Sequence, residues 1–306
     1  PVVRFIRLTV PLRGMGGGLC LLQTQTELPP MRELGAILGS LPAWKWVAAV
    51  LATGLSFWAL GRYDSVAHRH LGTGMDGPAA RRAGMAAIAF SQTAGFGLIT
   101  GSYARWRLLP GLSPLQAGQL TALVAVTFLA ALSVICGAAL ILAPPSPGLA
   151  WAGGVILAAA ASVSVFSFLH PQTPLFRLRL RWPSLTAMTA LGFWATADVA
   201  AAGTALWLLL PGGIDTSWAQ LLTAYAIALG FAVVSSAPGG AGPFALALCA
   251  LLPAVPDHSL IAGLLAFRLV YCAVTAVLAA LLMIFPGLLP ARAAAVGDTG
   301  LLGSRS

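Results

Sequence analysis

The sequence predicts an all-α, polytopic integral membrane protein with five or more spanning helices, two broken or re-entrant hairpins and a candidate inverted repeat. Three observations predict this class. The 306 residues are 58% hydrophobic, and only 8% are charged, against about 25% in an average soluble domain. Long apolar stretches follow one another through most of the chain, and two of these are interrupted by polar, Gly-rich centres. A chain of this composition cannot cover itself with polar surface, so lipid must be its solvent.

Five apolar stretches are long enough to cross a bilayer, which takes about 20 residues. They are Trp44–Leu60, Gly118–Ala143, Leu149–Leu169, Leu185–Leu210 and Ser259–Phe285. We therefore expect a polytopic membrane domain over residues 42–286. Residues 1–41 lack such a stretch and are expected to form an atypical N-terminal segment with a tendency to disorder. Residues 287–306 are expected to be a short cytoplasmic tail.

Two further apolar segments are broken in the middle. Ala83–Gly101 has the polar centre Ser91–Gly97, and Trp218–Leu252 has the centre Ser235–Gly242. Pro removes a backbone donor and clustered Gly raises the entropic cost of a helix, so both centres should end a helix. In lipid the freed backbone groups must face protein or water. Both segments are predicted to be broken or re-entrant hairpins, the alternative being two kinked helices.

Basic residues in the short loops predict the orientation, because such loops stay on the cytoplasmic side. The residues are Arg62, Arg69, Arg81, Arg82, Arg105, Arg107, Arg177, Arg179, Arg181 and Arg292, whereas loops 144–148 and 211–217 have none. This pattern places the basic loops and the C-terminus in the cytoplasm. The first hairpin would then enter from the cytoplasm and the second from outside. Hairpins that meet from opposite faces are typical of inverted-repeat transporters.

The composition also excludes several function classes. The net charge of +9 sits in short loops, which suits anionic lipid headgroups. A nucleic-acid partner would require a basic face with interleaved polar residues, and the sequence shows none. His68 and His70 would lie on different faces of a helix, and no C-x-x-C is present, so we expect no metal site. No nucleophile-elbow, phosphate-loop or dinucleotide motif occurs, so we expect no cofactor and assign no catalytic residue.

Two charges lie inside predicted spans, where each costs about 2.5–3.5 kcal/mol on insertion scales. Asp198 is near the middle of Leu185–Leu210, and Arg268 is within Ser259–Phe285. In antiparallel helices their depths differ by about 6 Å at the rise of an α-helix, which an Arg side chain can bridge. Asp198 is interpreted either as the structural partner of Arg268 or as a contact for a cationic headgroup.

Four motifs occur in an order that resembles one known family: Gly61–Gly72, Phe90–Leu108, Ser236–Phe244 and Phe267–Tyr271. Together they resemble the membrane domain of the lysylphosphatidylglycerol synthase/flippase family, which includes stand-alone relatives, and the resemblance covers about Trp44–Phe285. It implies an all-helical protein of the bacterial inner membrane that moves aminoacylated phosphatidylglycerol between leaflets. The sequence of this chain departs from the family pattern at two places. It has Gln92-Thr93 where Asn-Asn is common in the family, and Ala245 where Glu is common.

The resemblance implies a phospholipid partner, anionic or aminoacylated phosphatidylglycerol, and leaves a separate lipid-synthesising enzyme and a homo-oligomer open as further partners. The expected function is phospholipid translocation or binding. One alternative is the membrane half of a phosphatidylglycerol lysyltransferase, since the chain has no stretch long enough for an acyltransferase domain. The other is a non-transporting envelope scaffold.

The candidate lipid-binding residues come from the hairpin centres and the charges nearby. They are Gln92, Thr93, Arg105, Arg107, Asp198, Ser235, Ser236, Gly239, Gly240 and Arg268. An Arg fork can hold a phosphate by paired hydrogen bonds; the alternative interpretation, which we prefer for Arg105 and Arg107, is that they are side chains that reach the membrane surface. The glycines are expected to permit the backbone turn, and freed amides nearby could bind phosphate.

Overall fold

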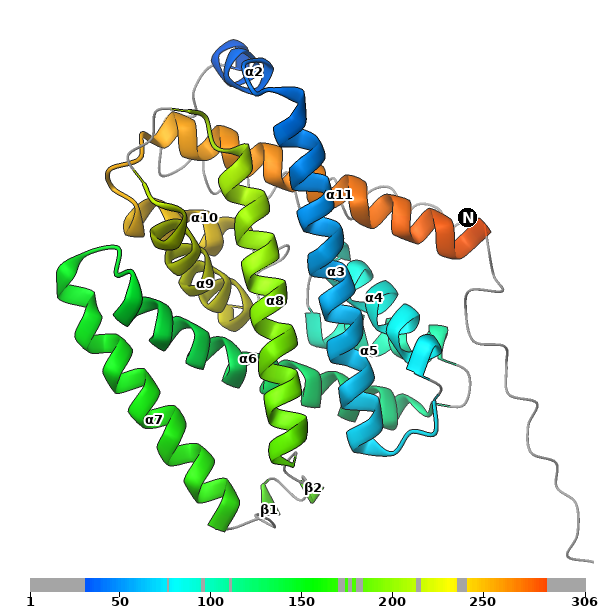
Figure 1. Ribbon diagram of the computed structural model, residues 1–306. Coiled ribbons are helices and arrows are strands. Elements are labelled where there is room, and N and C mark those ends of the chain that lie inside the picture. Colours follow the sequence, from blue (N-terminus) through cyan, green and yellow to red (C-terminus); the bar gives the residue numbers. More distant parts are fainter. Residues whose placement is uncertain are drawn as a thin grey trace, which may run out of the picture.

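The computed structural model describes residues 31–284, apart from 76, 95–96, 110–111, 170–173, 176–177, 180–183, 213–215 and 236–240. Within the described residues the chain is helical except for one ribbon of two very short strands (Figure 1). Six helices there are long and apolar enough to cross a membrane. The predicted fold class, a polytopic all-α membrane protein, is confirmed.

The first half of the chain holds α2 (Met31–Gly39), α3 (Ala43–Leu71), α4 (Gly77–Ala94), α5 (Gly97–Leu108), α6 (Pro114–Leu142), the 3-10 turn η1 (Pro147–Leu149) and α7 (Ala150–Leu169). The strands β1 (Pro174–Leu175) and β2 (Leu178–Arg179) pair antiparallel, with Pro174 opposite Arg179. The second half holds α8 (Leu185–Leu209), α9 (Trp218–Ser235), α10 (Ala241–Leu251) and α11 (Asp257–Ile284).

Local sequence explains several helix ends. Helix α6 begins with a capping box, in which the Ser113 side chain accepts from the Gln116 backbone N–H and the Gln116 side chain accepts from that of Ser113. Helix α3 ends at Gly72, whose φ of 61° is left-handed, and the Gly72 N–H donates to the Arg69 carbonyl. Glycine adopts that conformation without the steric cost of a Cβ.

Two predicted boundaries differ from the structure. Helix α3 runs on to Leu71, although the predicted span ended at Leu60. The sequence between Leu60 and Gly72 holds no Pro, and the helix continues because Asp64 and His68 are buried there and Asp64 pairs with Arg105 of α5. Helix α2 lies inside segment 1–41, which we expected to be atypical with a tendency to disorder. Its Leu34 is buried against Ile261 and Ala262 of α11.

Both interrupted segments form two helices rather than one kinked helix. Helix α4 ends at Ala94 and α5 begins at Gly97, and the two contact each other. Helix α9 ends at Ser235 and α10 begins at Ala241, again with contacts between them. Both breaks fall in the predicted polar centres. Helix α9 is also long and apolar enough to span, which makes it the sixth such helix.

The element order repeats. A long helix, a broken hairpin and a second long helix occur as α3, α4–α5, α6 and again as α8, α9–α10, α11. Helices α3 and α8 lie side by side and run in opposite directions (Figure 1). The contacts between the repeats are also equivalent. The first helix of each repeat contacts the last helix of the other, as α3 contacts α11 and α8 contacts α6. The first helix of each hairpin does the same, as α4 contacts α11 and α9 contacts α6. This arrangement supports the expected inverted repeat.

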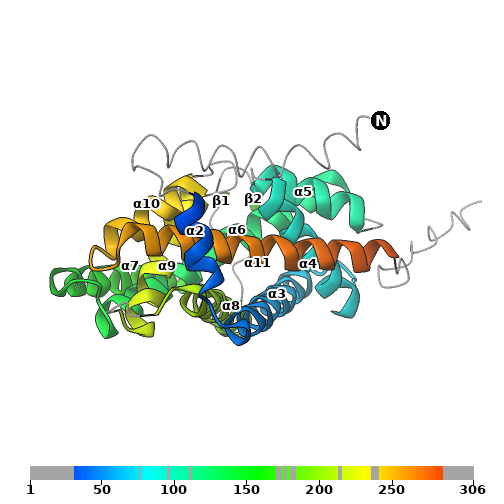
Figure 2. The same cartoon turned by 90° about the horizontal axis from the view of Figure 1, so that it is seen from above.

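The apolar core is largest in the second half, where α8, α9, α10 and α11 meet. Leu206, Leu209, Leu221, Leu248 and Leu260 are among its fully buried members. Seen from above, α11 crosses the molecule and contacts α3, α4, α8 and α10 (Figure 2). Helix α7 packs on α6 and exposes large apolar side chains such as Trp151 and Val155, as expected of a helix that faces lipid.

Candidate functional site

The first repeat contains a buried ionic centre formed by Asp64 of α3, Arg105 of α5 and Thr121 of α6. The exposed fractions of Asp64 and Arg105 are 0% and 2%. The Arg105 Nη2 donates to Asp64 Oδ1 at 2.5 Å, and its Nη1 donates to Thr121 Oγ1 at 3.2 Å. Since the pair lies beyond the reach of solvent, each charge depends on the other for its stability. The centre therefore ties the second helix of the hairpin to both long helices of its repeat.

His68 is the fourth member of this centre. Its Nε2 lies 3.5 Å from Asp64 Oδ2, one helical turn away, and its Nδ1 forms a hydrogen bond of 2.8 Å with Thr73 Oγ1. Asp64 Oδ2 and His68 Nε2 are buried and face each other in this ionic contact, whereas the buried Arg105 Nε has no hydrogen-bond partner among the described residues. Leaving such a donor unsatisfied costs about 1–3 kcal/mol.

Glycines let α4 close over this centre. A Cβ added at Gly84 would lie 2.5 Å from Asp64 Oδ2, and one added at Gly61 would lie 2.8 Å from Met85 Cγ. Real Cβ atoms do not approach other atoms so closely, so a larger residue would force α3 and α4 apart. The two glycines therefore permit the helix contact that keeps water from Asp64.

A second polar contact joins the two repeats. The Ser56 hydroxyl of α3 donates to Asp198 Oδ1 of α8 at 2.5 Å, and Asp198 is only 6% exposed. Tyr225 and Tyr271 lie within electrostatic range of both Asp198 and Arg268. These neighbours place both charges in the interior of the second repeat. The coupling between Asp198 and Arg268 stays a prediction.

The structure describes the side chains of only three of the remaining predicted site residues, Arg105, Arg107 and Ser235. Arg105 is buried in its ion pair, so its interpretation as a side chain that reaches the membrane surface is wrong; Arg107, two residues on, is exposed. The Ser235 hydroxyl donates to the Ala232 carbonyl of its own helix at 3.0 Å. The side chains of Gln92 and Thr93, and all of Ser236, Gly239 and Gly240, lie outside the described residues.

Sequence reasoning missed Asp64, His68 and Ser56. Asp64 and His68 lie between Arg62 and Arg69, which we assigned to a basic loop after the first predicted span, and Ser56 is one hydroxyl in an apolar run. A signal was present: Asp64 and His68 are four residues apart, so they share one helix face if the helix continues. Between Leu60 and Gly72 the sequence has no Pro and a single Gly, Gly61, which the helix tolerates. Nothing in this stretch therefore argues against a continuous helix.

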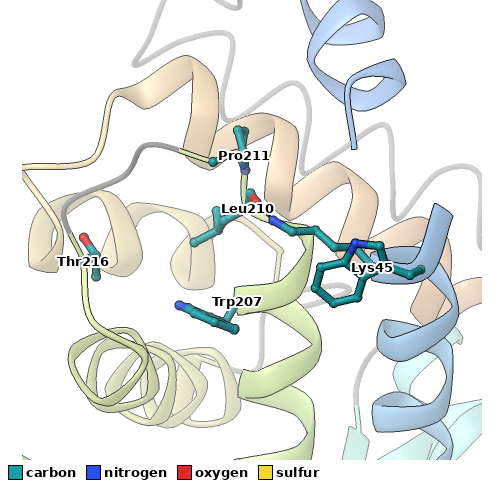
Figure 3. Close-up of a pocket in the computed structure, with 7 residues that line it drawn as sticks. Lys45, Trp207, Leu210, Pro211 and Thr216 are labelled. Carbon is teal, nitrogen blue, oxygen red and sulfur yellow. Dashed lines mark hydrogen bonds between the residues drawn. The ribbon is translucent and has the colours of Figure 1, made fainter. Parts of the chain in front are cut away.

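A cavity of about 200 Å³ opens at the other end of the α3–α8 pair (Figure 3). It is lined by Trp44, Lys45, Trp207, Leu210, Pro211, Gly212 and Thr216. The Lys45 Nζ donates to the Leu210 carbonyl at 3.1 Å, where α8 ends. A cation at a helix C-terminus compensates the dipole of the helix. We therefore assign Lys45 a structural role at the end of α8.

No model of a known protein family matches the chain, and no curated protein matches it significantly. In the part of the chain that the structure describes, no group of three or more His, Cys, Asp or Glu residues could hold a metal ion.

Proposed function

We propose that this protein binds a phospholipid and translocates it between the leaflets of the bacterial inner membrane. Anionic or aminoacylated phosphatidylglycerol is the proposed class of lipid. The observation that carries the proposal is the buried pair Asp64–Arg105, which fixes a broken hairpin between the long helices of one repeat. Charges inside membrane domains are costly, and they mark the pathways of polar substrates.

The architecture supports transport over a purely structural role. Inverted repeats with broken helices place a binding site at the interface of the repeats, and the protein alternates by rocking one repeat against the other. Here that interface is the contact of α3 with α8, where Ser56 bonds Asp198. The headgroup would pass along the polar groups beside this interface while the acyl chains stay in lipid. The four family-like motifs support a lipid as the substrate.

Translocation is tested in proteoliposomes that carry fluorescent phosphatidylglycerol or lysyl-phosphatidylglycerol. A membrane-impermeant reagent that quenches only the outer leaflet reports the fraction of lipid exposed with time. We expect faster exchange with the wild-type protein than in protein-free vesicles, and slower exchange with Arg105→Gln. Arg32→Gln removes the same charge from an exposed position outside the candidate lipid-binding residues and is the matched control. Exchange equal to that of empty vesicles would support the scaffold alternative instead.

We further propose that the basic loops and the C-terminus face the cytoplasm. Arg69 and Pro147 are both exposed, and they lie at opposite predicted ends of the helices. Single cysteines at these positions, in a chain whose native cysteines are replaced by alanine, are labelled in intact spheroplasts. We expect an impermeant maleimide to label position 147 at once and position 69 only after permeabilisation. The reverse pattern overturns the orientation.

A further inference from the structure

A second cavity, of about 230 Å³, lies where α3, α4 and α8 meet. It is lined by Arg62, Ser65, Arg69, Gly77, Arg81 and Trp194, and we refer to it as the arginine cavity. Arg62, Ser65 and Arg69 follow one face of α3 at helical spacing. Gly77 and Arg81 come from the first turns of α4, and Trp194 comes from α8. Three separate elements of both repeats therefore build its walls.

The arginine cavity holds three positive charges that the described chain does not neutralise. Among the described residues, no carboxylate lies within 4 Å of Arg62, Arg69 or Arg81. Asp64 is two residues from Arg62 in sequence, but its ion-pair partners are Arg105 and His68. Like charges that share a small cavity repel one another, and the repulsion strengthens away from bulk water. An anion in the cavity would relieve it.

Arg62 is held in place for such a contact. Its guanidinium carbon lies 5.0 Å from the centroid of the Trp58 ring and 5.8 Å from that of Trp194. Contact with two mutually perpendicular tryptophan rings restricts the fork, and a restricted fork loses less entropy when it binds an anion. The Arg62 Nε is buried and has no hydrogen-bond partner among the described residues, so the fold leaves this donor unused.

The walls of the cavity also favour a small anion. Helix α4 begins at Gly77, and the N-terminus of an 18-residue helix carries partial positive charge. Ser65 donates to the Gly77 carbonyl at 3.2 Å, which fixes the start of α4 against α3. The volume is below the roughly 300–1,000 Å³ of sites that enclose drug-sized ligands. It suits a headgroup rather than a whole lipid.

We propose that the arginine cavity binds a phosphate group, either the phosphodiester of an anionic phospholipid or a free phosphate ester. Guanidinium groups bind phosphate by paired, charge-assisted hydrogen bonds, and the three Arg residues can surround one phosphate from two helices. As a lipid site the cavity rests on the proposed function, but phosphate binding itself does not. Binding and translocation are therefore measured separately.

The test uses the purified full chain in nanodiscs of phosphatidylcholine. Binding of dilute phosphatidylglycerol is compared with that of diacylglycerol, which lacks phosphate, and the soluble probe glycerol 3-phosphate is titrated in a second arm. The variants are Arg69→Gln, Arg81→Gln and their combination, with Arg32→Gln, an exposed position in α2, as the control outside the cavity and outside the candidate lipid-binding residues. We expect each cavity variant to weaken phosphate binding about tenfold, with no change for the control. We also expect binding to fall with salt.

The outcomes separate the sources. Binding of phosphatidylglycerol without glycerol 3-phosphate, lost in the cavity variants, supports a lipid headgroup site. Binding of glycerol 3-phosphate that is lost in the same variants supports a site for free phosphate esters. Equal binding by the wild type, Arg69→Gln and Arg81→Gln, or equal binding of diacylglycerol, overturns the proposal. If binding follows the variants but lipid exchange does not exceed that of empty vesicles, the proposed function fails and the phosphate site stands.

Arg62→Lys gives an independent check because it keeps the charge and removes the planar fork. We expect it to weaken glycerol 3-phosphate or phosphatidylglycerol binding about tenfold. Since Arg62 contacts two tryptophans, the thermal stability of the variant is measured alongside. Wild-type affinity in a stably folded Arg62→Lys would show that the Arg62 fork does not hold the anion, against the three-arginine site proposed. If Arg62→Lys does not fold, Arg69→Gln and Arg81→Gln decide.

Discussion

Removing one partner of the Asp64–Arg105 pair should destabilise the protein more than any exposed charge change. Both side chains are almost fully buried, so solvent cannot screen the charge that is left behind. Breaking a buried pair from one side costs about 3–5 kcal/mol. Asp64→Asn keeps an oxygen that can accept from Arg105, so we expect a loss near the lower limit. Arg105→Gln strands a carboxylate whose remaining ionic neighbour is His68 at 3.5 Å, so we expect a larger loss.

The double variant Asp64→Asn/Arg105→Gln removes both charges together. No buried charge is then left without its counter-charge, so the double loss should be smaller than the sum of the single losses. We expect the difference to be about 2 kcal/mol, within the range measured for residues in one network. The contact of Arg105 with Thr121 is lost in both Arg105 variants, and it cancels in the comparison.

The measurement is reversible unfolding of the purified protein in mixed micelles, with denaturing detergent as the titrant and helical circular dichroism as the signal. Arg107→Gln, an exposed substitution of the same type, should stay within about 0.5 kcal/mol of the wild type. Additive losses, or single losses below about 1 kcal/mol, would falsify the view that the pair is desolvated and mutually dependent.

Two further predictions use the same unfolding assay. Gly84→Ala should lose about 1–3 kcal/mol by overpacking, because its Cβ would lie 2.5 Å from Asp64 Oδ2; Gly54→Ala, with nothing within 4 Å of the added Cβ, should be neutral or gain up to about 1 kcal/mol. Equal effects at the two glycines would argue against a tight α3–α4 contact. Asp198→Asn and Arg268→Gln should each destabilise, and their double variant should lose less than the sum; additive losses would favour a headgroup contact for Asp198.

The sequence could predict where helices cross the membrane and where they break, because both follow from local chemistry. Apolar length sets the spans, and Gly and Pro set the breaks. Helix α4 ends at Ala94 and α9 at Ser235, each inside a predicted polar centre. The continuation of α3 could not be predicted in the same way. The charged residues after Leu60 are typical of a loop, and the residue that neutralises Asp64, Arg105, is 41 positions away in the sequence.

The same distinction explains the outcome for the candidate site. A sequence shows which residues carry charge, but pairing depends on how helices pack. Arg105 and Arg107 look alike in sequence, yet the structure buries one and exposes the other. The three arginines of the arginine cavity were interpreted only as markers of the cytoplasmic side. Their convergence needs the contacts of α3 with α4 and with α8, which no local pattern reveals.

The two repeats agree in backbone order but differ in how they hold their hairpins. An ion pair anchors α5 to α3 in the first repeat. Helices α9 and α10 contain no charged residue, and apolar contacts such as the Tyr225–Phe244 ring pair at 5.4 Å hold them together. Displacing the first hairpin would strand a buried charge, at about 3–5 kcal/mol. An apolar hairpin that slides can exchange protein contacts for lipid contacts of similar polarity. In the proposed mechanism the second hairpin is therefore the one whose movement costs less, and the first is the fixed side of the pathway.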